Sequence, residues 1–230
     1  MIYKVKVRRI LSALLLSALL LVIFYFSLPR SLFQLPYATV VTDRSGELLG
    51  ARIAEDGQWR FPAMDRVPEK FRICLLQFED RYFYYHLGVN PVAMWRALVQ
   101  NIRQKKVVSG GSTLSMQTIR LYRNKPRTVG EKCIEMFLAF RLECQYSKKK
   151  ILALYASHAP FGGNVVGLEA ASWRYFGHPS AQLSWAEAAT LAVLPNAPAK
   201  LHLARNRQAL EQKRNRLATG CLPHQSAPFG

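Results

Sequence analysis

Acidic residues are scarce in this sequence of 230 residues. Thirty-two lysines and arginines stand against fourteen aspartates and glutamates, so the formal net charge at pH 7 is +18. Such an excess predicts an anionic partner, which could be nucleic acid, lipid headgroups or a phosphorylated substrate. The sequence has no aromatic-basic RNA-binding motif and no zinc-finger spacing, and both absences argue against nucleic acid.

Cysteines are few, and internal repeats are missing. The four cysteines form neither a Cys-x-x-Cys pair nor a regular framework, so we expect most of them to be core residues. They are Cys74, Cys133, Cys144 and Cys221. If Cys133 and Cys144 share one helix, the rise of about 1.5 Å per residue places them too far apart for a disulfide.

Charge is also missing from the run between Ile10 and Leu28, which is about as long as a bilayer span. Four basic residues precede it, so the positive-inside rule places residues 1–9 in the cytoplasm and the chain after the anchor outside. A cleaved signal peptide is the alternative, but the segment Ser27 to Ser31 lacks a small-x-small cleavage site. Beside a membrane, lipid phosphate is a better anionic partner than nucleic acid.

The length allows one anchor, residues 10–28, and one globular domain, but no second large domain. Alternating polar and apolar residues from Ala38 to Phe61 predict a small hairpin within a connector, residues 38–67. Apolar residues then recur at helical spacing, which predicts a helical domain over residues 68–205. Residues 206–230 are predicted to be a basic, partly disordered tail, rich in proline, glycine and serine from Gly220 onward.

Helix boundaries can be predicted from local residues. Lys105, Lys106 and the Gly110-Gly111 pair predict a basic, flexible loop that leads to an anion site at the next helix N-terminus. A helix is also expected from Thr128 to Tyr146, and a later apolar helix is expected to end at Pro195. The predicted N-caps are Asn90 followed by Pro91, Ser112, Ser147, and Ser184 in a capping box.

The first chemical cluster runs from Glu79 to Gly88 and gathers two carboxylates, an arginine, a histidine and four aromatic residues. Apolar neighbours would raise the pKa of a carboxyl group by desolvation, as a general base near neutral pH requires. An aromatic core helix with surface carboxylates is the equally weighted alternative.

Three further clusters are weaker when taken singly. Ser112, Thr113 and Gln117 follow glycines and lysines and suit a phosphate, although an ordinary capped helix also explains Ser112. Lys132 and Glu135 lie three residues apart and could be only an ion pair, which is worth about 0.3 to 0.5 kcal/mol when exposed. The fourth group, Pro160–Asn164, Tyr175–Gly177 and Leu194–Pro198, can be interpreted as loops.

Taken in order, these clusters resemble the motif series of glycosyltransferase family 51, the peptidoglycan glycosyltransferases. The resemblance covers residues 79–198, about half the chain, and is carried by Glu79, Asp80, Phe83, His86 and Gly88, then Gly111, Ser112, Thr113 and Gln117, then Lys132 and Glu135. The stretches Ala171–Gly177 and Leu191–Pro195 are most similar to 1C-type bifunctional penicillin-binding proteins.

The resemblance implies a mostly α, lysozyme-like glycosyltransferase domain whose lower lobe dips into the membrane. It implies that the 4-hydroxyl of one lipid II attacks the anomeric carbon of a lipid-linked glycan chain with inversion, releasing undecaprenyl pyrophosphate. The implied setting is the outer face of a bacterial inner membrane, with cell-wall synthesis proteins as further partners.

The resemblance also implies roles for individual residues. Glu79 would be the general base, while Glu135, with Lys132 and Arg127, would stabilise the leaving pyrophosphate directly or through Mg²⁺ or Mn²⁺ held at Glu135. The implied substrate-binding residues are Asp80, Phe83, His86, Ser112, Thr113, Gln117, Arg127, Lys132 and Asn164.

Three departures from the family pattern keep other functions open. Glu131 stands where the family usually has arginine, Ser157 stands where it usually has asparagine, and no transpeptidase with a Ser-x-x-Lys and Lys-Thr-Gly pair follows. We therefore expect a monofunctional enzyme or a truncated bifunctional protein, with truncation favoured by the irregular tail. The alternatives are a non-catalytic membrane protein that binds cell-wall precursors or assembly partners, and a lysozyme-like lytic enzyme.

Overall fold

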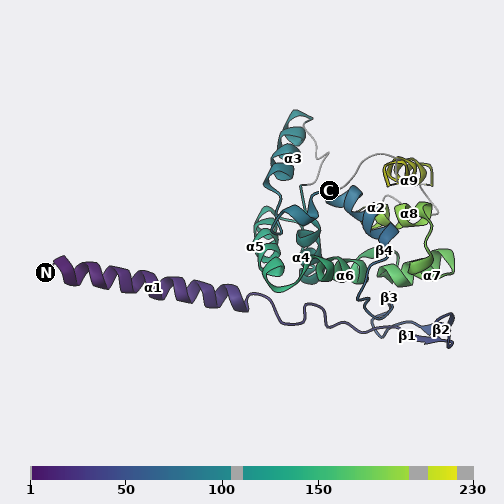
Figure 1. Cartoon of the computed structure of the whole chain (residues 1–230), viewed down its shortest axis with the longest axis horizontal. Helices are drawn as coiled ribbons and strands as arrows, with labels where there is room; N and C mark the ends of the chain where they lie inside the picture. Colours follow the sequence, from purple (N-terminus) through teal and green to yellow (C-terminus); the bar gives the residue numbers. More distant parts are fainter. Residues whose placement is uncertain (1, 105–110, 197–206, 222–230) are drawn as a thin grey trace.

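The computed structural model describes residues 2–104, 111–196 and 207–221, and in these ranges the chain is mostly helical, as the sequence predicts. Figure 1 shows an elongated N-terminal helix that projects from a helical body. The helices are α1 (Ile2–Phe26), α2 (Glu69–Glu79), α3 (Pro91–Arg103), α4 (Leu114–Arg123), α5 (Val129–Gln145), α6 (Lys148–His158), α7 (Leu168–Phe176), α8 (Trp185–Val193) and α9 (Arg207–Cys221), with short 3₁₀ turns at Phe83–Tyr85, Ser180–Gln182 and Leu194–Asn196.

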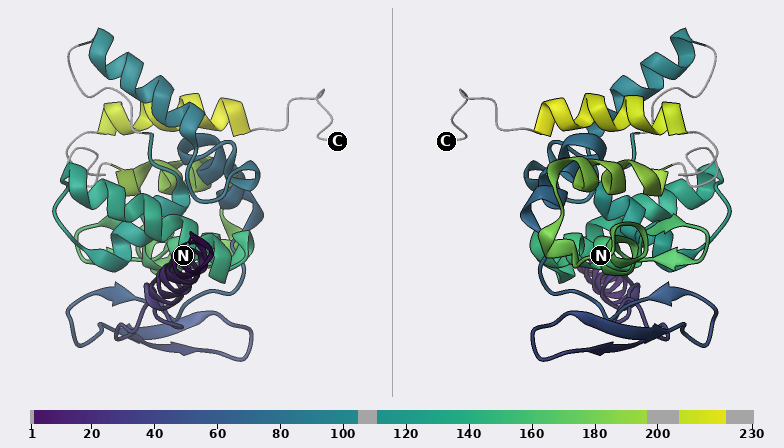
Figure 2. Two further views of the ribbon diagram at one scale, coloured as in Figure 1. Left: turned by 90° about the vertical axis from the view of Figure 1, so that its left-hand side faces the viewer. Right: turned by 90° about the vertical axis from the view of Figure 1, so that its right-hand side faces the viewer.

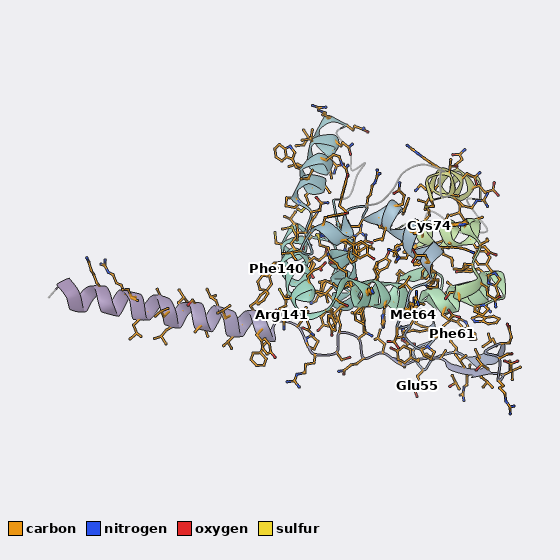
Figure 3. All side chains as sticks on the ribbon, in the orientation of Figure 1. Glu55, Phe61, Met64, Cys74, Phe140 and Arg141 are labelled. Carbon is orange, nitrogen blue, oxygen red and sulfur yellow. The ribbon has the colours of Figure 1, made fainter. Side chains whose placement is uncertain are left out.

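Helix α1 contains the expected anchor. Its segment Arg9–Phe26 is long and apolar enough to cross a membrane and is not buried against the described protein. Where α1 ends, Arg141 of α5 donates hydrogen bonds to the carbonyls of Phe24 (Nε, 3.0 Å) and Tyr25 (Nη2, 2.8 Å). Figure 3 shows Arg141 and Phe140 beside this end of the helix. Arg141 thus satisfies carbonyls that a helix end leaves unpaired and attaches the anchor to the body.

Two small sheets accompany the helices. Strands β1 (Thr39–Thr42) and β2 (Leu48–Arg52) form the predicted hairpin. Strand β3 (Trp59–Arg60) pairs in parallel with β5 (Val165–Val166), which also pairs with β4 (Pro160–Gly162). The sequence analysis interpreted Pro160–Asn164 as a loop. That interpretation is wrong for Pro160–Gly162, because pairing with a segment about a hundred residues earlier decides the structure there.

The hydrophobic core lies where α2, α4, α6 and α8 meet. Its largest fully buried side chains come from all parts of the domain and include Phe71, Phe83, Leu114, Ile151 and Phe161. Figure 2 shows α9 crossing over α8 on the side of the body away from the hairpin. The core therefore holds the end of α2 and the start of α4 in fixed positions.

Most predicted caps are present. The side chains of Asn90 and Ser147 each accept a hydrogen bond from the backbone N–H three residues on, and Ser184 forms the capping box with Glu187. Thr128, where no cap was predicted, caps α5 in the same way. The predicted cap at Ser112 is wrong, because Thr113 Oγ1 accepts from Met116 N instead (3.2 Å). The helix simply begins one residue later, which frees the Ser112 hydroxyl for another contact.

Two predictions about the cysteines and the tail need correction. Cys74 and Cys221 are buried, but Cys133 and Cys144 are exposed on α5, and all four are thiols. Residues 207–221, which the sequence analysis placed in a basic, partly disordered tail, form helix α9, which packs against α8 and α2. Its apolar residues, such as Leu210 and Leu217, are buried there. Packing of these few side chains therefore stabilises a helix in a segment that is polar overall. Lys105, Lys106 and Gly110 lie outside the described residues.

Candidate active site

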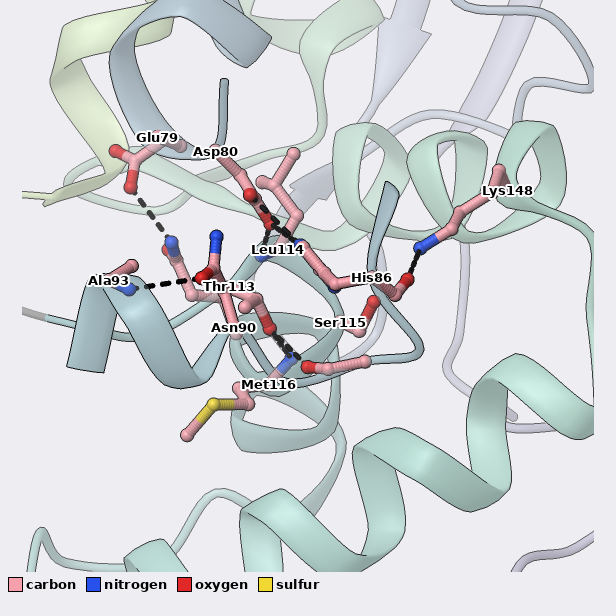
Figure 4. Close-up of polar contacts among 12 residues, drawn as sticks. Glu79, Asp80, His86, Asn90, Ala93, Thr113, Leu114, Ser115, Met116 and Lys148 are labelled. Carbon is pink, nitrogen blue, oxygen red and sulfur yellow. Dashed lines mark hydrogen bonds and ion pairs between the residues drawn. The ribbon is translucent and has the colours of Figure 1, made fainter. Parts of the chain in front are cut away.

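The site begins where α2 ends, with two adjacent carboxylates that point in different directions (Figure 4). Glu79 is the last helical residue, and its partly buried carboxylate accepts a hydrogen bond from Gln117 Nε2 (2.8 Å). Burial raises the pKa of Glu79 to about 7, while the Gln117 hydrogen bond acts in the opposite direction. This is the raised pKa that the sequence analysis expected of a general base.

Asp80 contacts residues other than those around Glu79. Its carboxylate lies 3.0 Å from His86 Nε2 and accepts a hydrogen bond from the backbone N–H of Leu114, also at 3.0 Å. Asp80 thereby joins the segment after α2 to the first turn of α4, where a carboxylate also interacts favourably with the helix dipole. Thr113 adds a second connection, because its hydroxyl donates to Gly88 O (2.5 Å).

Lys148 and Phe83 fix the position of His86. Lys148 Nζ donates to the backbone carbonyl of His86 (2.6 Å) and to Glu143 Oε1 (2.7 Å). The same ammonium lies 4.3 Å from the ring centroid of Phe83, which is fully buried. Phe83 is therefore a packing residue beneath His86, and it does not line the cavity described next.

A cavity of about 290 Å³ opens between the end of α2, the start of α3 and the segment before α4. Glu79, Asp80, Ser112 and Thr113 all line it, so the structure brings the first two predicted clusters together. Its other lining residues are Gln77, Phe78, Arg81, Tyr82, Asn90, Ala93, Arg96 and Gly111.

Glu135 lies on α5, and its partner is Arg120 of α4. The guanidinium binds the buried carboxylate in a two-pronged arrangement, with Nε at 2.8 Å from Oε1 and Nη2 at 2.7 Å from Oε2. Nη2 also donates to Ser112 Oγ (3.1 Å). The suggested ion pair between Glu135 and Lys132 is wrong, because the packing of α4 on α5 presents Arg120 to the carboxylate.

Arg120 was missed by the sequence analysis, although its spacing could have indicated it. Gln117 and Arg120 are three residues apart and therefore lie on one face of α4. Gln117 holds Glu79, Arg120 holds Glu135, and the Arg120 charge also acts to lower the pKa of Glu79. The two carboxylates predicted to be catalytic are thus joined through one helix face.

Lys132 and Arg127 are exposed, and neither makes an ion pair with any residue in the described ranges. Asn164 lies elsewhere, because its Nδ2 donates to Gly57 O (3.0 Å) beside the small sheet. It does not join the cavity at Glu79. Three of the nine residues predicted to bind substrate line this cavity, namely Asp80, Ser112 and Thr113. His86 and Gln117 do not line it but contact Asp80 and Glu79, which do.

The two single-residue departures from the family pattern, Glu131 and Ser157, have structural partners. Glu131, in the first turn of α5, pairs with Arg123 of α4. Ser157 is buried, and its hydroxyl accepts a hydrogen bond from Met64 N (3.1 Å), which fixes the segment before α2. Neither residue lines the cavity at Glu79. These substitutions therefore leave the geometry around both carboxylates intact.

A divalent cation does not fit at Glu135 as this site is arranged. Both carboxylate oxygens accept hydrogen bonds from Arg120, and a guanidinium would repel a cation there. Across the described ranges, no group of three or more histidine, cysteine, aspartate or glutamate residues could hold a metal ion.

Comparisons with known proteins agree on one family. A family model described as Transglycosylase matches residues 46–221. Penicillin-binding protein 1C of Escherichia coli (strain K12) is 42% identical over 190 residues, 82% of this chain and 25% of that protein. The Biosynthetic peptidoglycan transglycosylase of Pasteurella multocida (strain Pm70) is 37% identical over 183 residues, 78% of this chain and 74% of that protein.

A third relative, Penicillin-binding protein 1A of Aquifex aeolicus (strain VF5), is 38% identical over 181 residues. The match covers 78% of this chain and 25% of that protein. The chain thus spans about a quarter of the length of the penicillin-binding proteins that it matches.

Proposed function

The chain belongs to the transglycosylase family, and from this membership we propose that it polymerises lipid II into peptidoglycan glycan strands. The observation that carries the proposal is the raised pKa of Glu79, a partly buried carboxyl group at the wall of a cavity. A base with a pKa near 7 is ionised often enough to act and basic enough to accept a proton at neutral pH.

In the proposed reaction, Glu79 takes the proton from the sugar 4-hydroxyl of one lipid II as that oxygen attacks the anomeric carbon of the lipid-linked chain. The bond to the pyrophosphate oxygen breaks on the opposite face, so the configuration inverts. Gln117 holds the Glu79 carboxylate in place by the hydrogen bond already described. Such positioning saves orientational entropy in the step that joins the two sugars.

The leaving pyrophosphate is proposed to sit near Ser112 and Arg120. Glu135 fixes the Arg120 guanidinium, whose Nη2 also reaches the Ser112 hydroxyl. Lys132 and Arg127 are exposed and have no ion-pair partner among the described residues, so their charge remains available to a polyanion. Charge that builds on the leaving oxygens would be stabilised by these cations. A cation requirement remains a prediction, which titration of the polymerisation assay with a chelator tests.

We also propose that the domain lies on the outer face of a bacterial inner membrane, where such precursors would be used. The apolar segment Arg9–Phe26 and the basic residues before it support this orientation. Cell-wall synthesis proteins are proposed as further partners. The strong positive charge of the chain suits the anionic headgroups and phosphates at that surface.

The pH dependence of polymerisation tests the role of Glu79. Because the base must be ionised, we expect the initial rate with saturating lipid II in detergent to rise with pH, with a midpoint about 7. Gln117→Leu removes a hydrogen bond that lowers the pKa of Glu79, so its midpoint should lie at higher pH than that of the wild type.

Each outcome of this experiment is informative. A profile whose midpoint moves upward in Gln117→Leu supports Glu79 as the titrating base. A rate that is flat from pH 5 to pH 8 in the wild type contradicts the proposal. Shortening of preformed glycan chains without any polymerisation would instead support a lytic enzyme.

A further inference from the structure

Two of the four cysteines meet in the interior of the protein. Cys74 of α2 is fully buried, and Cys221, the last residue of α9, is 5% exposed. The packing of the two helices brings these residues together, because α9 packs against α2 and both cysteines belong to the same buried core. A Cβ added to Gly220, the neighbour of Cys221, would lie 3.7 Å from Gln77 Nε2, and Gln77 follows Cys74 by three residues on α2. Each thiol also shifts the pKa of the other.

We propose that Cys74 and Cys221 form a disulfide that fastens α9 to α2 when the domain meets a disulfide oxidant. This inference rests on the outward orientation proposed above, because disulfides persist in oxidising compartments and are rare in the cytosol. The two exposed cysteines cannot form a disulfide with each other. Cys133 and Cys144 lie eleven positions apart on α5, and the helical rise separates them by roughly 16 Å.

The chemistry is a two-step thiol–disulfide exchange. The Cys221 thiolate attacks one sulfur of the oxidant, giving a mixed disulfide and releasing one oxidant thiol. The Cys74 sulfur then attacks the Cys221 sulfur of the mixed disulfide, and its proton passes to the departing thiolate, which leaves as the second oxidant thiol. The protein loses two electrons and two protons, and the oxidant disulfide gains them.

Exposure sets the order of reaction, because Cys221 is 5% exposed whereas Cys74 is fully buried. The interaction between the two thiols acts in the same direction, since it lowers the pKa of Cys221 and, together with burial, raises that of Cys74. The nucleophile of the first step is therefore Cys221 at the end of α9, because the thiolate is the reactive form. Cys74 attacks second, when the neighbouring sulfur has already been activated as a mixed disulfide.

The disulfide would act on the helix that carries the general base. Cys74 lies five residues before Glu79 on α2, and the covalent bond closes a loop from residue 74 to residue 221. A cross-link across so long a loop restricts the unfolded chain strongly. We expect it to raise the thermal unfolding midpoint by about 5 to 15 °C.

Thiol counting on the full chain in detergent tests the pair directly. After incubation with oxidised glutathione, denaturation and alkylation with a maleimide, a Cys133→Ser/Cys144→Ser variant should show no reactive thiol. It should show two after reduction, and peptide mass spectrometry should find Cys74 joined to Cys221. Two free thiols in the oxidised variant, or glutathione on each sulfur without a cross-link, would overturn the inference.

A second variant tests whether the rise in unfolding midpoint depends on this cysteine pair. Cys221→Ala changes a residue at the end of α9 and should remove both the cross-link and the rise in unfolding midpoint, while leaving the midpoint of the reduced protein nearly unchanged. An equal rise on oxidation in Cys221→Ala would also overturn the inference, because no pair would remain to explain it.

Labelling in intact cells separates this inference from the orientation. A membrane-impermeant maleimide should label the exposed Cys133 and Cys144 from outside. Protein isolated after all free thiols have been blocked by alkylation should already contain the Cys74–Cys221 bond. Unlabelled Cys133 and Cys144 would contradict the proposed orientation, while oxidation of the purified chain would still support the pair. Labelled Cys133 and Cys144 with four free thiols would overturn the disulfide.

Discussion

Glu79→Gln is expected to abolish the formation of glycan chains from lipid II, with a loss of rate of about 10² to 10⁴. Glutamine keeps the shape of the side chain but cannot accept the proton of the attacking hydroxyl. Lipid II should still bind, because the cavity walls and Ser112 remain. The measurement is the yield of polymer from labelled lipid II in detergent, together with precursor binding by the same preparation.

The matched control is Glu69→Gln on the same helix. Glu69 begins α2, is exposed and pairs with Arg72, so its replacement should leave polymerisation close to the wild-type rate. Polymerisation by Glu79→Gln at the wild-type rate would remove Glu79 from the mechanism. Loss of activity in both variants would point to damage to α2 and not to a missing base.

Glu79→Gln should also change the stability of the protein, by an amount that depends on pH. Because the folded-state pKa of Glu79 lies above its ordinary value of 4.5, its contribution to stability is full below pH 4.5 and is lost as pH rises through about 7. Glu79→Gln has no such loss. The free energy of unfolding of the variant minus that of the wild type should therefore be about 1 to 3 kcal/mol larger at pH 8 than at pH 4. Melting of both proteins at the two pH values measures this difference.

Arg120→Met is the second substitution with a large expected effect. It leaves the carboxylate of Glu135 buried without its guanidinium, and removing one partner of a buried pair costs about 3 to 5 kcal/mol. Polymerisation should also fall strongly, because the proposed leaving-group site loses its central cation. Thermal melting and the lipid II assay measure the two losses.

Arg123→Met provides the control on the same helix. Arg123 lies three residues after Arg120 and pairs with Glu131, whose carboxylate is more accessible than that of Glu135. Its loss should change stability far less than the loss of Arg120 and should leave polymerisation nearly intact. Equal effects of Arg120→Met and Arg123→Met would show that Arg120 has no special position at the site.

Local signals made much of the fold predictable. The apolar run of the anchor, the hairpin turns and the caps at Asn90, Ser147 and Ser184 depend on residues within a few positions of each other. The raised pKa of Glu79 was predicted from apolar neighbours in the chain, of which Phe78 and Tyr82 line the same cavity, whereas Phe83 packs beneath His86. The choice between Ser112 and Thr113 as cap shows the one-residue limit of such reasoning.

Contacts between distant segments could not be predicted in this way. Arg120 and Glu135 meet because α4 packs on α5, and β3 finds β5 a hundred residues later. The pairing of Cys74 with Cys221 depends on helix α9, whose polar sequence suggested an irregular tail. In each case the partner is chosen by tertiary packing, which overrides local preference.

The protonation of Glu79 is the most direct test of the account. An infrared difference titration of the wild type minus Glu79→Gln isolates the carboxyl signal of this residue in the full chain. A midpoint near pH 7 is the predicted result. A midpoint near 4.5, the ordinary value for glutamate, would mean that this carboxyl group is not desolvated and would contradict its assignment as the general base.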